Sequence, residues 1–162
     1  MLILGTSVTT STSPIISRRN GVTPRIADSA AAQRFGCRRG VRHLHVSGLR
    51  HDPVQIDLPI GHVEAMIDER YAALIDDLPK LRTSIVTAIE ARFGERVARI
   101  DQEIAAASIP APIAPLLQVS EGTPALLIRR TYRGHSNRAF EVSIGYYPTG
   151  RFVYRNALLR RY

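Results

Sequence analysis

The chain has 162 residues, 44% of them hydrophobic, and a formal net charge of +8. This length and composition suit one globular domain with a sizeable core and exclude an intrinsically disordered chain. No apolar run approaches the roughly 20 residues that cross a bilayer, so we expect no membrane association. The single cysteine, Cys37, excludes an intramolecular disulfide and favours a cytoplasmic location.

Charge is unevenly distributed along the chain, and all but one of its 22 basic residues are arginines. Residues 1–61 hold 8 basic and 3 acidic residues, residues 62–123 hold 6 and 10, and residues 124–162 hold 8 and 1. Arginine binds planar oxyanions through paired hydrogen bonds, which is compatible with an anionic ligand or nucleic acid. An arginine-rich codon usage explains the skew equally well. No basic helix carries a recognisable motif, which argues against nucleic-acid binding by this chain alone.

The first third of the chain predicts strands around one short helix. Asn20-Gly21 and Pro24 favour a loop, and Gly36 ends a helix that Asp28 or Ser29 caps. In order, the predicted elements are a strand over residues 2–17, a loop or hairpin over Arg18–Ile26, a helix over Ala30–Phe35, a strand over Arg42–Arg50, a tight turn at His51-Asp52-Pro53 and a return strand over Val54–Leu58.

The middle of the chain is acidic and predicted to be largely helical. Ile85, Ile89 and Phe93 recur at spacings of four and mark the buried side of one helix, which Gly94 ends. The predicted elements are one helix or two short ones over Val63–Ile75, a helix from Thr83 or Ser84 to Phe93, a strand over Arg96–Ala107, a short helix or loop over Pro110–Val119 and a turn over Ser120–Pro124.

The last quarter predicts an antiparallel three-strand meander over Ala125–Arg133, Arg138–Tyr147 and Phe152–Leu159. In the second strand Glu141, Ser143 and Tyr147 alternate with apolar residues and therefore share one face. The whole order predicts an α+β fold, a mainly antiparallel sheet with helices packed on one face.

Few residue patterns point to chemistry by themselves. Glu141, Ser143 and Tyr147 are either solvent-facing or the polar lining of a pocket, and alternation leaves both open. Ser84 either caps its own helix or helps to hold an anion at the helix start. His43 and His45 share a strand face, but no third ligand follows at a standard spacing, so we expect no metal site. No phosphate-binding loop or nucleophile elbow is present, and we expect no cofactor.

The C-terminal block is similar to a known family. Gly122–Tyr132, Arg138–Ser143 and Tyr147-x-x-x-Arg151-Phe152 resemble the end of the UTRA domain, the effector-binding domain of HutC-type GntR transcription regulators. The resemblance extends upstream over nearly the whole chain, in family order. The matching upstream segments are Gly5 with Val8-Thr9-Thr10, Ala31-x-x-x-Phe35-Gly36, Gly48-Leu49-Arg50, Pro53–Asp57, Ser84-Ile85-Val86 and Arg92-Phe93-Gly94.

This resemblance implies a chorismate lyase-like fold and a single UTRA-like domain over residues 1–162 that binds a small, often anionic effector. Arg50 would meet the anionic end of the ligand, and Asp57 and Glu141 would accept hydrogen bonds from its hydroxyl or amino groups. The ligand-binding residues that the resemblance implies are Arg50, Asp57, Ser84, Glu141, Tyr147 and Thr10. It also implies a homodimer, no catalysis, and DNA contact only through a winged helix-turn-helix domain outside these residues.

Three positions depart from the family pattern. Gly48 stands in place of an arginine, Val86 in place of a tyrosine, and Asp57 in place of a glutamate. These departures imply a ligand that is smaller than an amino-sugar phosphate, or differently shaped. Two alternatives remain open from the sequence: a chorismate lyase-like enzyme with Glu141 as general acid, and an interaction domain that has lost ligand binding.

Overall fold

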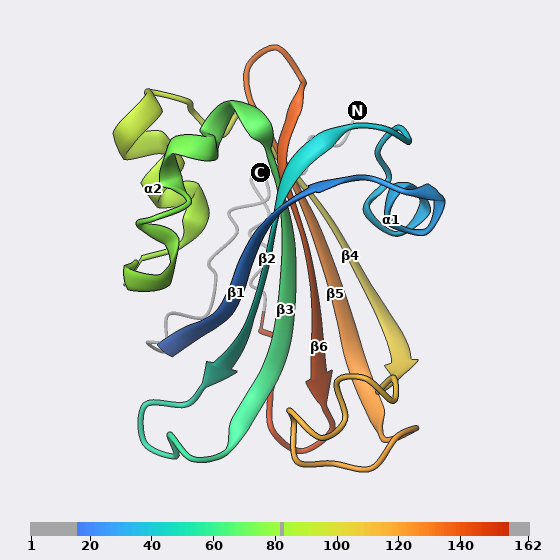
Figure 1. Ribbon diagram of the computed structural model, residues 1–162. Coiled ribbons are helices and arrows are strands. Elements are labelled where there is room, and N and C mark those ends of the chain that lie inside the picture. Colours follow the sequence, from blue (N-terminus) through green and yellow to red (C-terminus); the bar gives the residue numbers. More distant parts are fainter. Residues whose placement is uncertain (1–15, 82, 156–162) are drawn as a thin grey trace, which may run out of the picture.

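A six-stranded antiparallel sheet forms the centre of the computed structural model, which describes residues 16–81 and 83–155. The sheet consists of two meanders, β1–β2–β3 and β4–β5–β6, that join through the β3–β6 pair (Figure 1). In spatial order its strands are β1 (Ile16–Ile26), β2 (Arg42–His51), β3 (Pro59–Asp68), β6 (Ala139–Pro148), β5 (Pro124–Arg133) and β4 (Arg99–Ser108).

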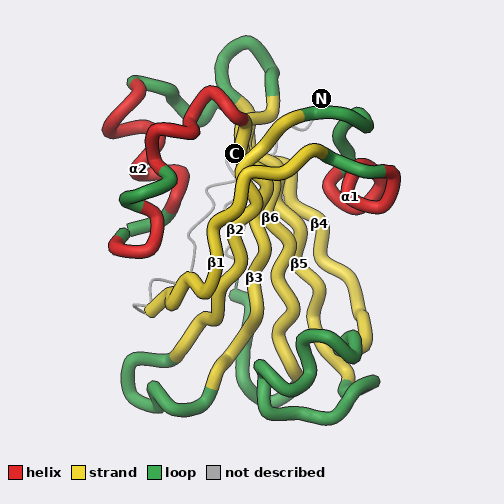
Figure 2. The backbone as a smooth tube through the Cα atoms, viewed as in Figure 1, coloured by secondary structure: helices red, strands yellow, loops and turns green. Residues whose placement is uncertain are grey.

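Four short helices within residues 16–81 and 83–155 flank this sheet. The α-helix α1 (Ser29–Phe35) connects β1 to β2. The segment between β3 and β4 contains the 3₁₀ helices η1 (Glu69–Leu74) and η2 (Leu78–Lys80), followed by α2 (Ile85–Phe93). Figures 1 and 2 show α1 and α2 on opposite sides of the sheet. No helix among the described residues has the length and apolarity needed to cross a membrane.

Both α-helices begin and end where local sequence signals predict. The Asp28 carboxylate accepts a hydrogen bond from the Ala31 amide at 2.8 Å, and the Ser84 hydroxyl accepts one from the Thr87 amide at 3.0 Å. At the other ends, Gly36 and Gly94 adopt φ angles of 65° and 68°. These left-handed conformations favour glycine, because it has no Cβ to clash with the following carbonyl.

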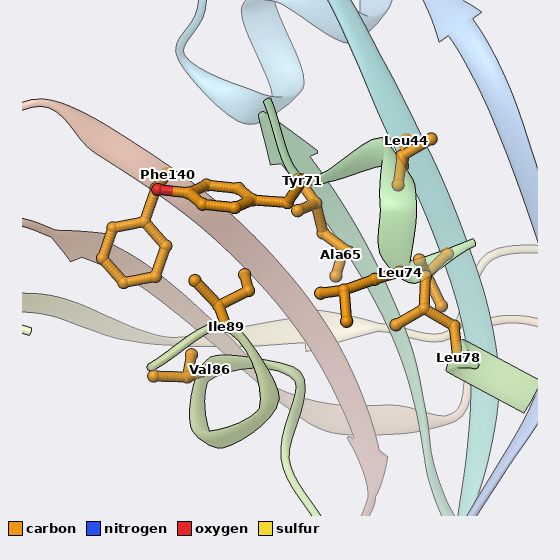
Figure 3. Close-up of a cluster of buried hydrophobic side chains, with 10 residues drawn as sticks. Leu44, Ala65, Tyr71, Leu74, Leu78, Val86, Ile89 and Phe140 are labelled. Atoms are coloured by element: carbon orange, nitrogen blue, oxygen red, sulfur yellow. The ribbon is translucent and has the colours of Figure 1, made fainter. Parts of the chain in front are cut away.

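Alternation along the central strands defines two faces of the sheet. On the first, which we call the α2 face, Leu44, Ala65 and Ile67 pack with residues of η1, η2 and α2 in one buried cluster (Figure 3). Ile89 of α2 is fully buried there. Burying an aliphatic side chain of this size contributes about 1.5–3 kcal/mol, so this cluster fixes α2 on the sheet.

The opposite face, which we call the α1 face, has its own core. Met66, Val142 and Ile144 each come directly after a residue of the α2 face, so their side chains point to the other face. There they pack with Phe35 of α1. The segment between β4 and β5 closes the far end of this face, with Leu117 fully buried. The prediction of helices on one face therefore holds for η1, η2 and α2, whereas α1 packs on the other face.

A bulge at the start of β6 changes the alternation locally. Tyr132 of β5 pairs with Glu141 and Arg133 pairs with Ala139, so Phe140 is an extra residue. Phe140 is buried in the α2-face cluster and meets the Tyr71 ring edge-on at 6.1 Å between centroids. The bulge therefore places two consecutive residues, Phe140 and Glu141, toward the α2 face.

The prediction of a loop or hairpin over Arg18–Ile26 is wrong, because these residues belong to β1. The strand accommodates Asn20-Gly21 by a register shift between Arg19 and Gly21. It accommodates Pro24 because β1 is an edge strand, where a missing backbone N–H is tolerated. The predicted strand over residues 2–17 lies mostly outside the described residues.

Two further predictions between β2 and α2 are wrong. Val54–Leu58 lies in a loop, and the return strand β3 begins only at Pro59. The helix expected over Val63–Ile75 is β3 up to Asp68 and η1 after it. Both faces of β3 are covered, so its apolar residues form a nearly continuous run that lacks the alternation of a half-exposed strand.

The predicted meander is shifted by one strand. β5 and β6 pair as expected, but the outer neighbour of β5 is β4. The described part of the expected third strand, Phe152–Arg155, has no strand conformation, and residues 156–159 lie outside the described residues. The expected strand over Arg96–Ala107 is confirmed as β4.

Candidate functional site

The α2 face carries a row of site residues at the end of the sheet nearest the β2–β3 loop. Arg50 of β2 pairs with Gly61 of β3, and the pairing of His62 with Tyr146 sets Gly61 opposite Tyr147. Two strand spacings separate Arg50 from Tyr147, about 10 Å between their backbones. A cationic and a phenolic side chain therefore start from one row of the same face.

Tyr147 occupies space that two glycines leave open. A Cβ on Gly61 would lie 2.6 Å from its ring, and a Cβ on Gly145 would lie 2.7 Å from the ring and 3.0 Å from its hydroxyl. The phenol thus lies along β6 with its hydroxyl above Gly145, toward the middle of the face. Phe152 stacks on the ring with 4.3 Å between centroids, and the Tyr147 side chain is buried.

Arg151 anchors the chain between Tyr147 and Phe152. Its guanidinium donates hydrogen bonds to the carbonyl oxygens of Pro59, Leu117 and Gln118. These bonds tie the residues after β6 to the start of β3 and to the segment between β4 and β5. This anchoring holds the chain in the position from which Phe152 packs on Tyr147.

A second polar group of residues lies on the same face, farther along the strands. Glu141 pairs with Tyr132, six residues and about 20 Å of strand from Tyr147. Burial raises the pKa of Tyr132 and the neighbouring Glu141 raises it further, whereas Arg130 and Arg50 act in the opposite direction. The charges of both arginines therefore reach the Tyr132 phenol.

The structure resolves which way the arginines of β5 face. Arg130 pairs with Ser143 on the α2 face, and its Nε donates to the Gln102 side chain at 2.7 Å. Arg133 turns away at the bulge, where its Nε donates to Asp101 at 2.8 Å. Arg130 is therefore part of the polar lining, together with Ser143, and Arg133 is not.

Ser84 leads α2 onto the same side of the sheet, because Val86 and Ile89 pack on the α2-face core. Its side chain is exposed and caps the helix, accepting from the Thr87 amide and bonding the Thr87 hydroxyl at 2.7 Å. Among the described residues no acceptor is present for the Ile85 and Val86 amides. These two N–H groups, with the helix dipole, favour an anion at this end of α2.

Two of the expected ligand residues are not brought into this arrangement. Asp57 is exposed in the β2–β3 loop, and its backbone carbonyl accepts a hydrogen bond from the Gln118 side chain at 3.1 Å. Gln118 belongs to the segment that covers the α1 face. Thr10 lies outside the described residues. The structure therefore gathers Arg50, Glu141 and Tyr147 on one face, with Ser84 on the helix that covers it.

His43, His45 and His62 lie on the α1 face, away from these residues. His45 Nε2 lies 3.8 Å from Glu64 Oε2, and Arg34 of α1 forms an ion pair with the same carboxylate. Burial raises the pKa of Glu64, but His45 and Arg34 outweigh it and leave this pKa lowered. Within residues 16–81 and 83–155, no group of three or more His, Cys, Asp or Glu side chains is arranged to hold a metal ion.

Tyr132 and Phe152 are site residues that sequence reasoning missed. The period-two spacing of Ile128, Arg130 and Tyr132 shows that they share a face, but only the register with Glu141 shows which face it is. Two arginines, two phenols and one carboxylate on a partly covered face supply donors and acceptors for a polar, negatively charged molecule. Such an arrangement suits the binding of a ligand and offers no activated nucleophile among the described residues.

Comparisons with known proteins agree with this reading of the fold. The family model of the UTRA domain matches residues 21–153. The chain is similar to the ligand-binding domain of a GntR-family transcriptional regulator from Bordetella bronchiseptica, with 23% identity, a TM-score of 0.78 and 98% of both chains covered. It is also similar to the effector domain of PhnF from Mycobacterium smegmatis, with 18% identity, a TM-score of 0.74, and 90% of this chain and 87% of that one covered.

A GntR-family regulator from Enterococcus faecalis V583 is similar over 87% of this chain and 99% of its own, with 19% identity and a TM-score of 0.70. No curated protein sequence matches the chain. The chorismate lyase-like fold expected from the sequence is confirmed. The matched domains belong to regulators and are not enzymes, which confirms the expectation of a non-enzymatic domain over the lyase alternative. The chain belongs to the UTRA family, the effector-binding domains of GntR-family transcriptional regulators.

Proposed function

We propose that the α2 face binds a small anionic metabolite and that this binding controls the DNA affinity of a winged helix-turn-helix domain linked to the present one in a cytoplasmic regulator. The observation that carries the proposal is the placement of Arg50, Arg130, Glu141 and Tyr132 on one face of the sheet, with Glu141 buried and Tyr132 half-buried. Arginine at a partly desolvated site binds carboxylate or phosphate through strong, charge-assisted hydrogen bonds.

The remaining groups of the face suit the rest of such a ligand. Glu141 accepts hydrogen bonds from ligand hydroxyl or amino groups, and Tyr147 supplies one phenolic hydroxyl. The start of α2 at Ser84 supplies amide donors for the anionic end. The family pattern has an arginine where this chain has Gly48. The loss of that cationic side chain favours a ligand with fewer negative oxygens than an amino-sugar phosphate.

The coupling to DNA is supported by the names of the similar proteins. The domain from Mycobacterium smegmatis is called an effector domain, and that from Bordetella bronchiseptica a ligand-binding domain of a transcriptional regulator. A ligand shifts a regulator between two states only by binding them with different affinity. In this protein the element that would carry that difference is α2, which packs on the same face of the sheet.

A ligand screen with matched variants tests the proposed site. Phosphorylated sugars, phosphonates and carboxylates are screened by thermal shift, and each hit is measured by calorimetry. A binder at 100 times its dissociation constant stabilises the domain by about 2.7 kcal/mol. We expect Arg50→Ala and Glu141→Ala each to weaken binding of a confirmed effector about tenfold or more, because each removes a charge-assisted hydrogen bond.

Arg39→Ala serves as the control, since Arg39 is exposed on the loop after α1. It removes the same charge as Arg50→Ala without touching the α2 face. Unchanged affinity in both Arg50→Ala and Glu141→Ala would show that the site lies elsewhere. Failure of every anion to bind would favour a domain that has lost ligand binding.

We also propose that two copies of the chain pair through β4. This strand is one of the two edges of the sheet, and Ile100 and Ile104 are 45% and 42% exposed on its α2 face. A ten-residue edge strand with exposed apolar residues is prone to pair with another strand.

Light scattering after gel filtration should give the mass of a dimer for the native chain and of a monomer for Ile104→Lys. Ala73→Lys, exposed on η1, is the control. A native monomer, or an Ile104→Lys dimer, would refute pairing through β4.

A further inference from the structure

A cavity of about 570 Å³ lies on the α1 face, on the side of the sheet away from Arg50 and Tyr147. Its lining residues come from α1 and the loop after it, the start of β2, the end of β3, the start of η1 and the start of β6. Phe35, Met66 and Val142 form its apolar wall and are all nearly fully buried. The volume falls within the range of small-molecule sites, and the apolar wall suits an aromatic or aliphatic body.

Arginines surround this wall. Arg42 pairs with Glu69 at 2.7 Å, and Arg70 and Arg138 share one carboxylate, that of Asp68, at 3.3 and 2.9 Å. A guanidinium has five N–H donors, so two arginines that share one carboxylate retain donors for a further acceptor. Arg38 also lines the cavity and forms no ion pair with any described residue. Three carboxylates also line the cavity, those of Asp68, Glu69 and Glu141, so its four arginines leave an excess of one positive charge.

We propose that this cavity is a second ligand site, which takes a small organic acid with an apolar body. The body packs on Phe35, Met66 and Val142, and the carboxylate is bound by Arg38 and Arg42 where the loop after α1 joins β2. The cavity lining includes Glu141, which also belongs to the proposed effector site, but the acid is bound by Arg38 and Arg42, which are not part of that site. The proposal therefore goes beyond the effector function, and failure of an acid to bind at Arg38 and Arg42 would leave that function untouched.

The chain carries its own reporter for this site. Cys37, the only cysteine, lines the cavity and is partly buried. Burial raises the pKa of its thiol, so alkylation by iodoacetamide is best followed at pH 9. The alkylation rate of the full chain is measured by intact mass with increasing phenylacetate. At ten times the dissociation constant about one molecule in eleven is unliganded, so a protecting ligand slows the reaction about tenfold.

Phenylacetamide, which has the same ring and no charge, is the ligand control. We expect saturable protection by phenylacetate and none by phenylacetamide over the same concentrations. Equal protection by both would refute an acid site and leave only an apolar hollow. No protection by phenylacetate would refute the second site.

Variants locate the binding group. Arg38→Gln combined with Arg42→Gln should raise the half-protecting concentration about tenfold or more, because it removes two charged donors. Arg39→Gln removes a neighbouring arginine that does not line the cavity and should change nothing. Arg50→Ala should also leave protection intact. Protection that survives the double variant, or that is lost in Arg50→Ala, would refute this site. The comparison of phenylacetate with phenylacetamide on the native chain remains decisive if the double variant does not fold.

Discussion

Tyr147 shows how much one side chain in this site depends on backbone atoms around it. Its ring lies where Cβ atoms on Gly61 or Gly145 would stand, and Phe152 covers its other side. Arg151 in turn fixes Phe152 by holding three carbonyl oxygens. The phenol points toward the middle of the α2 face because Gly61 and Gly145 have no Cβ to occupy its place and because Phe152 covers its other side.

Gly145→Ala should therefore displace the Tyr147 ring. The added methyl overlaps the ring and its hydroxyl, and overpacking of this kind costs about 1–3 kcal/mol. We expect that loss in urea unfolding, together with weaker binding of an effector at the α2 face. Gly21→Ala is the matched control, because its Cβ would meet only the Ser47 hydroxyl at an ordinary 3.7 Å. Equal stability of the native chain and Gly145→Ala would mean that Tyr147 moves freely.

At the scale of the element, α2 connects helix stability to the site. Ser84 caps the helix through the Thr87 amide, and Val86 and Ile89 bury its inner side on the sheet. Ser84 thus has one observed role and one proposed role. As a cap it stabilises α2, and in the proposed ligand site it would present a hydroxyl and amide groups to an anion.

Two substitutions of Ser84 separate these roles. Ser84→Ala should lower the free energy of unfolding by about 1 kcal/mol, because the Thr87 amide loses its acceptor. Ser84→Asp keeps an acceptor and suits the helix dipole, so it should retain the stability of the native chain. It should nevertheless repel an anionic effector and lower its affinity. If calorimetry finds full affinity in Ser84→Asp, Ser84 acts as a cap alone.

At the scale of the whole molecule, buried ionisable groups tie α1 to the sheet. Arg34 of α1 reaches Glu64 of β3, with His45 and His62 beside that carboxylate. Burial lowers the pKa of His62, and burial likewise lowers that of His43. The folded chain thus holds two imidazoles neutral on the α1 face.

Stability should fall as the solution becomes acidic. Below about pH 6.5 the unfolded chain binds protons at His43 and His62 that the folded chain resists, so the free energy of unfolding decreases. Each group contributes a slope of at most about 1.4 kcal/mol per pH unit. The lowered pKa of Glu64 stabilises the fold above about pH 4.5, and this contribution is lost as the pH falls through its folded value.

Urea unfolding at a series of pH values checks this expectation. His62→Gln should flatten the dependence between pH 6.5 and 5, whereas His135→Gln, in an exposed turn, should leave it unchanged. A native chain equally stable at pH 7 and pH 5 would contradict the prediction.

Local signals were enough for part of this fold. Asp28 with Gly36 and Ser84 with Gly94 defined both α-helices, because caps act within one turn. Alternation identified β5 and β6 and set Glu141, Ser143 and Tyr147 on one face. It did not reveal β3, whose two covered faces remove the alternation, or β1, which tolerates Pro24 at an edge.

The sequence by itself determined the helix ends, the alternating C-terminal strands and the family, since these depend on neighbouring residues and on motif order. Only the tertiary structure decided which residues meet. The pairing of β4 with β5 and of β3 with β6, and the bulge at Phe140, bring Arg130 and Tyr132 to Glu141 and exclude Arg133. Strand register depends on contacts between segments far apart in the chain, and a slip of one residue would send every side chain to the opposite face.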